Sequence, residues 1–180
     1  MRVADVDLAS GAVGERLSDV VGPVDLAVCE TDALVLGCGP LSRLEVPGSH
    51  RLVVSGASPL WNGLGISTIG SAALSLHALG LQAVVLHERA KSPHVLILDR
   101  SASGALRAHT EPIDCEAVWR DGGAYGMLRA AAALANRPSR VLATGPAART
   151  TTFGAIGSAS AGSDVFDTWA GRAGFGTQLL

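Results

Sequence analysis

The clearest pattern of apolar and polar positions runs through residues 51–81. Short apolar runs at 52–54 and 83–86 predict strands, and residues 71–79 carry apolar side chains at helical spacing, followed by Gly80 as a helix stop. The stretch 55–70 is rich in Gly and Ser and predicts a loop before that helix. Such a loop favours a bound anion, because free N–H groups point outward at a helix N-terminus. A tight crossover loop explains the same glycines, so the pattern leaves both interpretations open.

The rest of the chain shows strand and helix spacings in irregular alternation. An alanine-rich helix is predicted over residues 126–136, where Pro138 follows its end. Strand patterns occur at 3–8, 33–36, 42–49, 95–98, 105–110 and 141–143.

Two parts of the chain resemble each other. V-L-G-C-G-P-L-S-R at 35–43 is similar to V-L-A-T-G-P-A-A-R at 141–149, and each is followed by a Trp-x-Gly segment, at Trp61 and Trp169. We interpret residues 1–180 as a single domain with an internal repeat, roughly 33–86 and 139–180; chance similarity between glycine-rich segments is the alternative. In the first copy the Trp-x-Gly segment leads into a helix and a buried strand. The second copy stops at Leu180 before such elements, so we expect it to be incomplete and a partner chain to complete it.

Composition narrows the functional classes. The apolar fraction is 48% and the aromatic fraction only 4%, so the core is built mainly from Ala, Val and Leu. A net charge of −2 gives no electrostatic case for nucleic acid or an acidic membrane surface. We expect no transmembrane helix, since no apolar run reaches about 18 residues.

The N-terminus and the cysteines both favour a cytoplasmic protein. The acidic N-terminus does not read as a signal peptide. The three cysteines (Cys29, Cys38 and Cys115) are far apart, which favours reduced thiols in the cytoplasm. No C-x-x-C occurs, so we expect no iron–sulfur ligands and no metal site in this chain. The excess of arginine over lysine suggests a GC-rich bacterial genome.

A series of collinear segments resembles the N-terminal domain of the tungsten-containing aldehyde ferredoxin oxidoreductase family. They are G-P-L-S at 39–42, H-R-L-V-V at 50–54, S-P-L at 58–60, G-S-A-A-L-S-L-H-A-L-G at 70–80, A-V-V-L-H-E-R-A-K-S-P-H-V-L-I-L at 83–98, G-P-A at 145–147, F-G-A-I at 153–156 and A-G-R-A-G-F-G at 170–176. The resemblance implies an α+β fold of duplicated half-barrel β-sheets with a helix in each half.

The resemblance also implies a cofactor. In that family the domain is a platform for two pyranopterins that hold tungsten, and a molybdenum pterin is the related possibility. An arginine before Ser-Pro-Leu and another in Ala-Gly-Arg meet the pterin there, and these positions fall on Arg51 and Arg172. Guanidinium groups bind phosphate bidentately, and glycines admit close backbone approach. The resemblance therefore predicts cofactor-binding residues Arg51, Ser67, Thr68, Gly70, Gly171, Arg172 and Gly174. It identifies no catalytic residue.

Three departures from the family pattern bear on that prediction. Ser-Thr-Ile-Gly at 67–70 replaces an Asn-Ser-Gly-Gly-type segment, with a branched Ile69. Gly-Arg-Ala-Gly at 171–174 replaces Gly-Arg-Gly-Gly, and S-D-V-F-D-T-W at 163–169 replaces an Asn-Asp-Gly-His-type stretch.

Two functions follow as hypotheses. The first is the pterin-platform subunit of a split oxidoreductase acting on aldehydes or related substrates, with a second chain carrying the cluster and catalytic domains. The second is a stand-alone, cofactor-free descendant, monomeric or a homodimer, that binds a small molecule or catalyses a non-redox biosynthetic step. On residue spacing alone, Arg51 and Arg172 also fit ordinary surface positions.

Overall fold

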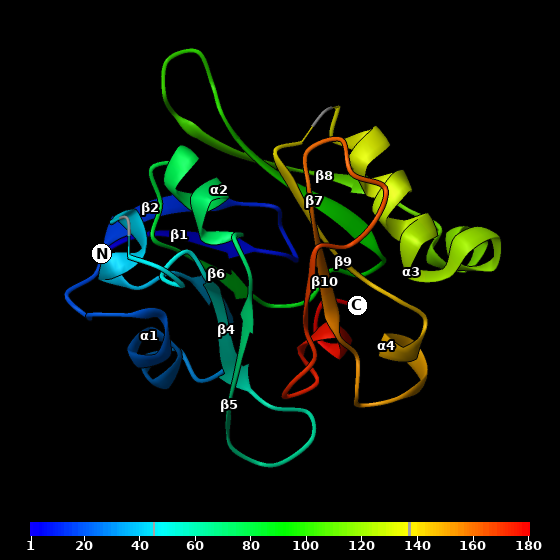
Figure 1. Cartoon of the computed structure of the whole chain (residues 1–180), viewed down its shortest axis with the longest axis horizontal. Helices are drawn as coiled ribbons and strands as arrows, with labels where there is room; N and C mark the ends of the chain where they lie inside the picture. The colour runs from blue at the N-terminus through cyan, green and yellow to red at the C-terminus, as the bar shows by residue number, and fades with distance from the viewer. Residues whose placement is uncertain (45, 137) are drawn as a thin grey trace.

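The computed structural model describes residues 1–44, 46–136 and 138–180. It mixes several β-sheets with helices, which confirms the predicted α+β class. The N-terminal half forms one side of the molecule, and the C-terminal half forms the other (Figure 1).

The N-terminal half combines a hairpin, a helix and a three-strand meander, closed by a second helix and a final strand. Its elements are β1 (Arg2–Asp7), β2 (Val13–Leu17), α1 (Pro23–Cys29), β3 (Leu34–Gly37), the 3-10 helix η1 (Pro40–Arg43), β4 (Leu52–Ala57), β5 (Leu64–Ile69), α2 (Ala73–Ala78) and β6 (Ala83–His87).

These strands make one six-stranded sheet in the order β2-β1-β6-β3-β4-β5. The last strand, β6, sits between the hairpin and the meander, where it is parallel to β1 and antiparallel to β3. Its residues Ala83, Val84, Val85 and Leu86 are all buried, as expected for a strand covered on both faces. β6 therefore holds the two parts of this half together.

The C-terminal half repeats this order of elements up to its last turn. It contains β7 (His94–Arg100), β8 (Leu106–Pro112), α3 (Cys115–Leu134), β9 (Arg140–Thr144), α4 (Ala147–Thr150), β10 (Ile156–Ser160), β11 (Thr168–Ala170) and the 3-10 helix η2 (Phe175–Thr177). Here β7 and β8 form a separate two-stranded sheet, and β11-β10-β9 form a three-stranded one. Each half thus runs through hairpin, helix, strand, helical turn and hairpin.

The largest apolar cluster lies between the halves. Val54 and Ile69 of the six-stranded sheet meet Ile156, Ala170 and Phe175 of the other half there, all with under 1% of their surface exposed. A second cluster packs α3 on β9 through residues such as Trp119, Leu128 and Val141, and a third lies between α1 and the first sheet. The expected core of small aliphatic residues is present.

Two predicted elements differ from the structure. The alternation at 42–49 predicts a strand, but Pro40 starts a 3-10 helix, and the chain then turns through Pro47 and Gly48. The stretch 55–70 was predicted as a loop; instead the strands β4 and β5 occupy most of it. Small residues there serve close packing between strands, so their number signals a tight sheet and not a loop.

The alanine-rich helix is longer than predicted. It starts at Cys115, because Asp114 caps it by accepting a hydrogen bond from the Ala117 N–H at 3.0 Å. Gly123 breaks the helical geometry with φ of +57°, a left-handed value that favours glycine, so α3 is two helices joined at a kink.

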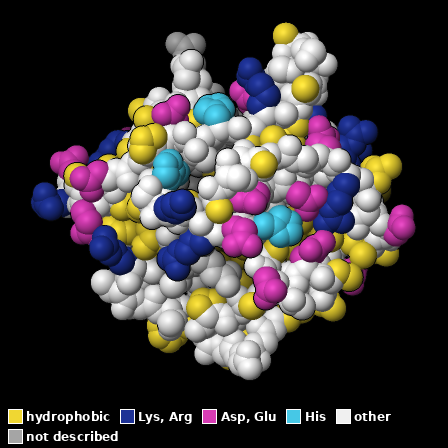
Figure 2. All heavy atoms as spheres, turned by 180° about the vertical axis from the view of Figure 1, so that it is seen from behind, with side chains coloured by type: hydrophobic (Ala, Val, Ile, Leu, Met, Phe, Trp, Pro, Cys, Tyr) yellow, Lys and Arg dark blue, Asp and Glu magenta, His cyan; other side chains and the backbone are white. Residues whose placement is uncertain are grey.

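The rear face of the molecule carries basic and acidic side chains that interleave without forming a field of one sign (Figure 2). Ion pairs such as Arg16–Asp5 and Arg107–Asp99, both at 2.7 Å, match this pattern. The arrangement agrees with the small net charge.

Candidate functional site

The predicted site residues gather where the edge strands of the two halves run side by side. The Gly70 N–H donates to Thr168 Oγ1 at 3.1 Å, and the Arg172 N–H donates to Ser67 Oγ at 3.3 Å. The earlier residue of β5, Ser67, contacts the later residue of the other segment, Arg172, and Gly70 contacts the earlier Thr168. β5 and the 168–172 segment therefore run antiparallel. Side-chain hydroxyls thus join two sheets that share no backbone ladder. We call this contact the β5–β11 junction.

Glycine is required at the junction because the two strands approach closely. A Cβ at Gly65 would lie 2.6 Å from the Ala173 Cβ and 2.9 Å from the Phe175 Cζ. A Cβ at Gly70 would lie 2.8 Å from the Thr168 Cγ2. All three distances are shorter than side chains tolerate. Gly70, predicted as a cofactor contact, therefore has a packing role in the structure, and its contact with a cofactor stays a prediction.

Arg51 lies on the outward face of β4 and β5. It is exposed, and its Nη1 donates to Thr68 Oγ1 at 3.3 Å. The strand register pairs Val53 with Thr68, so alternation places Arg51, Val53 and Thr68 on the same face. Ser67 lies on the opposite, buried face and meets the 168–172 segment.

Arg172 and Gly171 are exposed beside the same strand. A Cβ at Gly171 would meet nothing within 4 Å, so this glycine leaves open space next to the backbone. Gly174 differs: it is buried with φ of +69°, and a Cβ there would lie 2.1 Å from the Thr152 carbonyl oxygen. Packing thus accounts for Gly174, and binding at this position stays a prediction.

The two departures that replace glycine both point into the core. Ile69 has 0% of its surface exposed and packs in the cluster between the halves. Ala173 is 2% exposed, adopts φ of +61° and packs against Gly65 and the Ser58 side chain, whose hydroxyl donates to the Ala173 carbonyl at 3.0 Å. Neither side chain therefore obstructs the outward face that carries Arg51.

The replaced stretch 163–169 contributes aromatic side chains instead of amides. Phe166 packs against Trp169 with ring centroids 4.5 Å apart, and against Tyr125 of α3 at 5.2 Å. Trp61, in the turn between β4 and β5, and Trp169 are both about half exposed. Apolar surface of this kind beside a polar site is typical of an interface or of a ligand with a flat ring.

A second cluster of reactive side chain types joins η1 to α2. The His77 Nδ1 accepts from the Arg43 Nε–H at 3.3 Å, so the Nε2 carries the proton in the neutral ring. That Nε2 lies 2.9 Å from Ser42 Oγ and 3.7 Å from Cys38 Sγ, and the Ser42 hydroxyl donates to the Gly39 carbonyl at 2.6 Å.

The electrostatics of this cluster argue against a nucleophile. Burial raises the pKa of the Cys38 thiol, which keeps it protonated. Burial, together with the Arg43 charge, lowers the pKa of His77. Ser42 has already committed its proton to a backbone carbonyl. The cluster therefore fastens η1 to α2, and no local sequence pattern predicts that Ser42 joins it.

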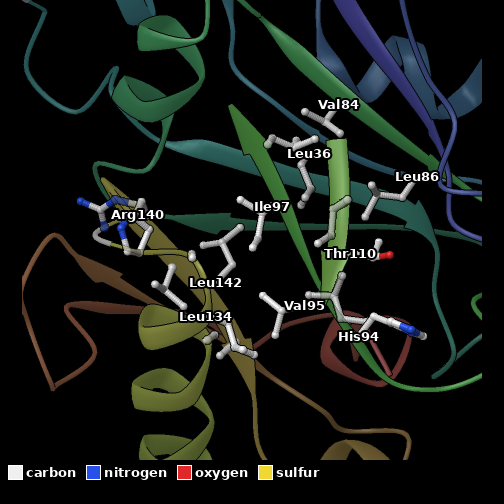
Figure 3. A pocket seen from close by; sticks show the side chains of 18 of the residues that line it. Leu36, Val84, Leu86, His94, Val95, Ile97, Thr110, Leu134, Arg140 and Leu142 are labelled. Carbon is white, nitrogen blue, oxygen red and sulfur yellow. The ribbon is translucent and has the colours of Figure 1, made fainter. Parts of the chain in front are cut away.

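A large cavity lies elsewhere. It measures about 830 Å³ and is walled mainly by aliphatic side chains of both halves (Figure 3). Of the seven predicted cofactor-binding residues, all within the described part of the chain, none lines it.

The described residues lack both a membrane-spanning helix and a metal-binding group of side chains. They contain no helix long and apolar enough to cross a membrane. They also contain no group of three or more His, Cys, Asp or Glu side chains that could hold a metal ion.

Comparison with known proteins gives relatives that are much longer than this chain. Glyceraldehyde-3-phosphate:ferredoxin oxidoreductase of Pyrococcus furiosus is 32% identical over 166 residues, which covers 82% of this chain but 25% of the relative. An uncharacterized protein of Methanocaldococcus jannaschii is 38% identical over 64 residues, which covers 36% of this chain and 10% of that protein. The chain therefore spans about a quarter or less of these relatives.

One solved structure is similar to this chain in its fold. The active site complex BamBC of benzoyl-coenzyme A reductase, in complex with 1,5-dienoyl-CoA, superposes with a TM-score of 0.75 over 98% of this chain and 28% of that one, at 19% identity. The sequence profile described as "Aldehyde ferredoxin oxidoreductase, N-terminal domain" matches residues 10–180. The chain therefore belongs to the aldehyde ferredoxin oxidoreductase N-terminal domain family.

Proposed function

We propose that this chain is the pterin-binding platform of a tungsten- or molybdenum-dependent oxidoreductase, whose cluster and substrate pocket reside on a second polypeptide in a bacterial cytoplasm. The observation that carries the proposal is the β5–β11 junction. There the side chain of Arg51 contacts Thr68, and the backbone N–H of Arg172, far away in sequence, contacts the adjacent Ser67.

The residues at the junction fit a phosphate-bearing ligand. Arg51 and Arg172 are exposed, and neither forms a salt bridge with a carboxylate in the described part of the chain. Guanidinium groups in this state can form paired, charge-assisted hydrogen bonds with a phosphate. Gly171 leaves backbone accessible beside them, and the bulkier replacements Ile69 and Ala173 face the core.

Each residue then has a binding role. Arg51 and Arg172 would hold phosphate or ring oxygens, while Thr68 orients the Arg51 side chain and can share its hydroxyl with the ligand. Gly171 would let backbone approach the ligand closely. A tungsten pterin, when bound, supplies the oxidation–reduction chemistry. Substrate activation and electron delivery are assigned to the second polypeptide, because the relatives carry about three quarters of their length outside the matched region.

Arginine variants test the assignment without relying on activity. We expect Arg51→Ala and Arg172→Ala, each isolated anaerobically with its co-purifying partner, to lose at least tenfold in pterin per chain, measured by fluorescence after oxidative release. Arg107→Ala is the matched control, because Arg107 is an exposed arginine paired with Asp99 on the β7–β8 hairpin. The assignment is wrong if both site variants keep wild-type pterin content.

The cofactor-free alternative makes the opposite forecast. A stand-alone descendant would bind a small molecule and contain neither metal nor pterin in the wild type. The cavity of about 830 Å³ is the feature that favours it, since its volume lies in the range of small-molecule pockets.

A further inference from the structure

Three aromatic side chains form a row beside the β5–β11 junction. Phe166 lies between Trp169 of β11 and Tyr125 of α3, with ring centroids 4.5 Å and 5.2 Å away. Trp169 is 44% exposed and Tyr125 is 45% exposed, whereas Phe166 packs against the cluster beneath α3. The row therefore has a covered centre and two open ends. We call it the aromatic row.

The aromatic row is held firmly from below. The strand register pairs Gly157 of β10 with Trp169, and a Cβ at Gly157 would lie 2.5 Å from the Phe166 Cδ1, so the Phe166 ring rests on bare glycine backbone. The next residue, Asp167, accepts hydrogen bonds at Oδ2 from the Ser160 N–H at 2.9 Å and the Ser160 hydroxyl at 2.8 Å. An aromatic face that is already fixed loses little conformational entropy when a ligand binds to it.

Trp169 faces the same side of the junction as Arg51. Ile69 of β5 and Ala170 of β11 both have 0% of their surface exposed and pack in the cluster between the halves. Side chains alternate along a strand, so their chain neighbours Thr68 and Trp169 face outward. The Arg51 guanidinium donates to Thr68 at 3.3 Å on that outward face. An exposed indole and an exposed guanidinium therefore share one surface.

The surface between these two groups is open and lacks a competing anion. Gly171 follows β11 directly, and a Cβ there would meet nothing within 4 Å. Arg51 forms no salt bridge with a carboxylate among the residues that the structure describes. The guanidinium is thus available to an anion, and the glycine leaves room for whatever joins that anion to a ring stacked on Trp169.

We propose that Trp169 determines the specificity of this site, because its exposed face stacks on the flat heteroaromatic ring of a ligand whose phosphate Arg51 binds. Stacking on an aromatic side chain accepts any ring with a π-face, and arginine forms charge-assisted hydrogen bonds with phosphate. A pterin phosphate and a nucleotide share this chemistry. The inference rests on the proposed function only for the choice between these two ligands.

Hydroxyl-radical footprinting with mass spectrometry tests the stacking in the unaltered chain, isolated from a strain that cannot make the pterin cofactor. Trp61 is an internal control, because it is 50% exposed against 44% for Trp169 and lies in the turn between β4 and β5. The probes are neopterin monophosphate, guanosine monophosphate, neopterin and inorganic phosphate. At least one of the two ring phosphates should lower the oxidation of Trp169 severalfold and leave Trp61 unchanged, while inorganic phosphate should protect neither.

Variants separate stacking from a structural role of the indole. Trp169→Leu should weaken binding of the protecting ring phosphate by about tenfold in calorimetry, which is the usual effect of losing one stacked ring. Trp169→Phe should keep most of the affinity, because a phenyl ring still stacks. Circular dichroism verifies that both variants are folded. Absence of Trp169 protection by either ring phosphate would overturn the proposal, as would a folded Trp169→Leu variant that binds as tightly as the wild type.

The two ring phosphates also identify the ligand. Protection by neopterin monophosphate alone assigns the surface to a pterin, and protection by guanosine monophosphate alone assigns it to a nucleotide; either result supports the role of Trp169. A native protein that contains pterin but shows no protection of Trp169 would overturn this inference and leave the proposed function standing. Protection by guanosine monophosphate in a protein that never contains pterin would do the reverse.

Discussion

His77 illustrates how one residue type can suggest catalysis and serve structure. The sequence places it beside apolar helix positions, and the structure holds its ring between Arg43 and Ser42. The Arg43 hydrogen bond requires an unprotonated Nδ1, so the folded state favours the neutral ring. Burial acts in the same direction, and together they lower the pKa of His77 below its ordinary value near 6.5.

This pKa shift predicts a pH dependence of stability. The unfolded chain takes up a proton at this histidine near pH 6.5, while the folded chain resists protonation until lower pH. Stability should therefore be fully present above about pH 6.5 and fall as the pH drops toward the folded-state pKa. We expect the melting temperature of the wild type to fall more between pH 7.5 and 5.5 than that of His77→Gln. Equal falls in scanning calorimetry would remove His77 as the cause.

At the scale of elements, one of the two hydroxyls that join β5 to the 168–172 segment, that of Ser67, is buried. Ser67 Oγ accepts the Arg172 N–H, and Ser67 is 5% exposed, so its loss leaves a backbone donor without that partner. Thr68 is next to it in sequence but faces outward and bonds only the exposed Arg51 side chain in the described residues. The two neighbours differ mainly in which face of β5 they occupy.

Paired substitutions measure that difference. Ser67→Ala should lower the free energy of unfolding by about 1–2 kcal/mol, because an unsatisfied buried donor costs that much. Thr68→Val, the matched control, should change it by roughly 0.5 kcal/mol or less, since exposed hydrogen bonds contribute little. Urea denaturation followed by circular dichroism gives both values. A Ser67→Ala effect no larger than the control would show that the hydroxyl does not join the sheets.

The elements also show what sequence patterns could and could not supply. The strands at 33–36, 83–86 and 141–143 were predictable because buried strands are short continuous apolar runs, and the structure places strands there. β5 was missed because two of its three buried positions are Gly65 and Ser67, small residues that contact a segment more than 100 positions away. The contacts of the Arg51 side chain and of the Arg172 backbone with β5 were not predictable, since no local spacing encodes a contact between such distant segments.

At the scale of the whole molecule, the two halves share an order of elements but differ in their sheets. The first half forms one six-stranded sheet, and the strands of the second half form two separate sheets. The apolar cluster and the β5–β11 junction both lie between the halves and hold them against each other.

The direct measurement of this account is the metal and pterin content of the chain isolated anaerobically, with whatever co-purifies, from the cell that makes it. Inductively coupled plasma mass spectrometry and fluorescence after oxidative release give both quantities per chain. The account predicts tungsten or molybdenum together with pterin, in fixed proportion to the complex. A stable complex that contains neither metal nor pterin would contradict it.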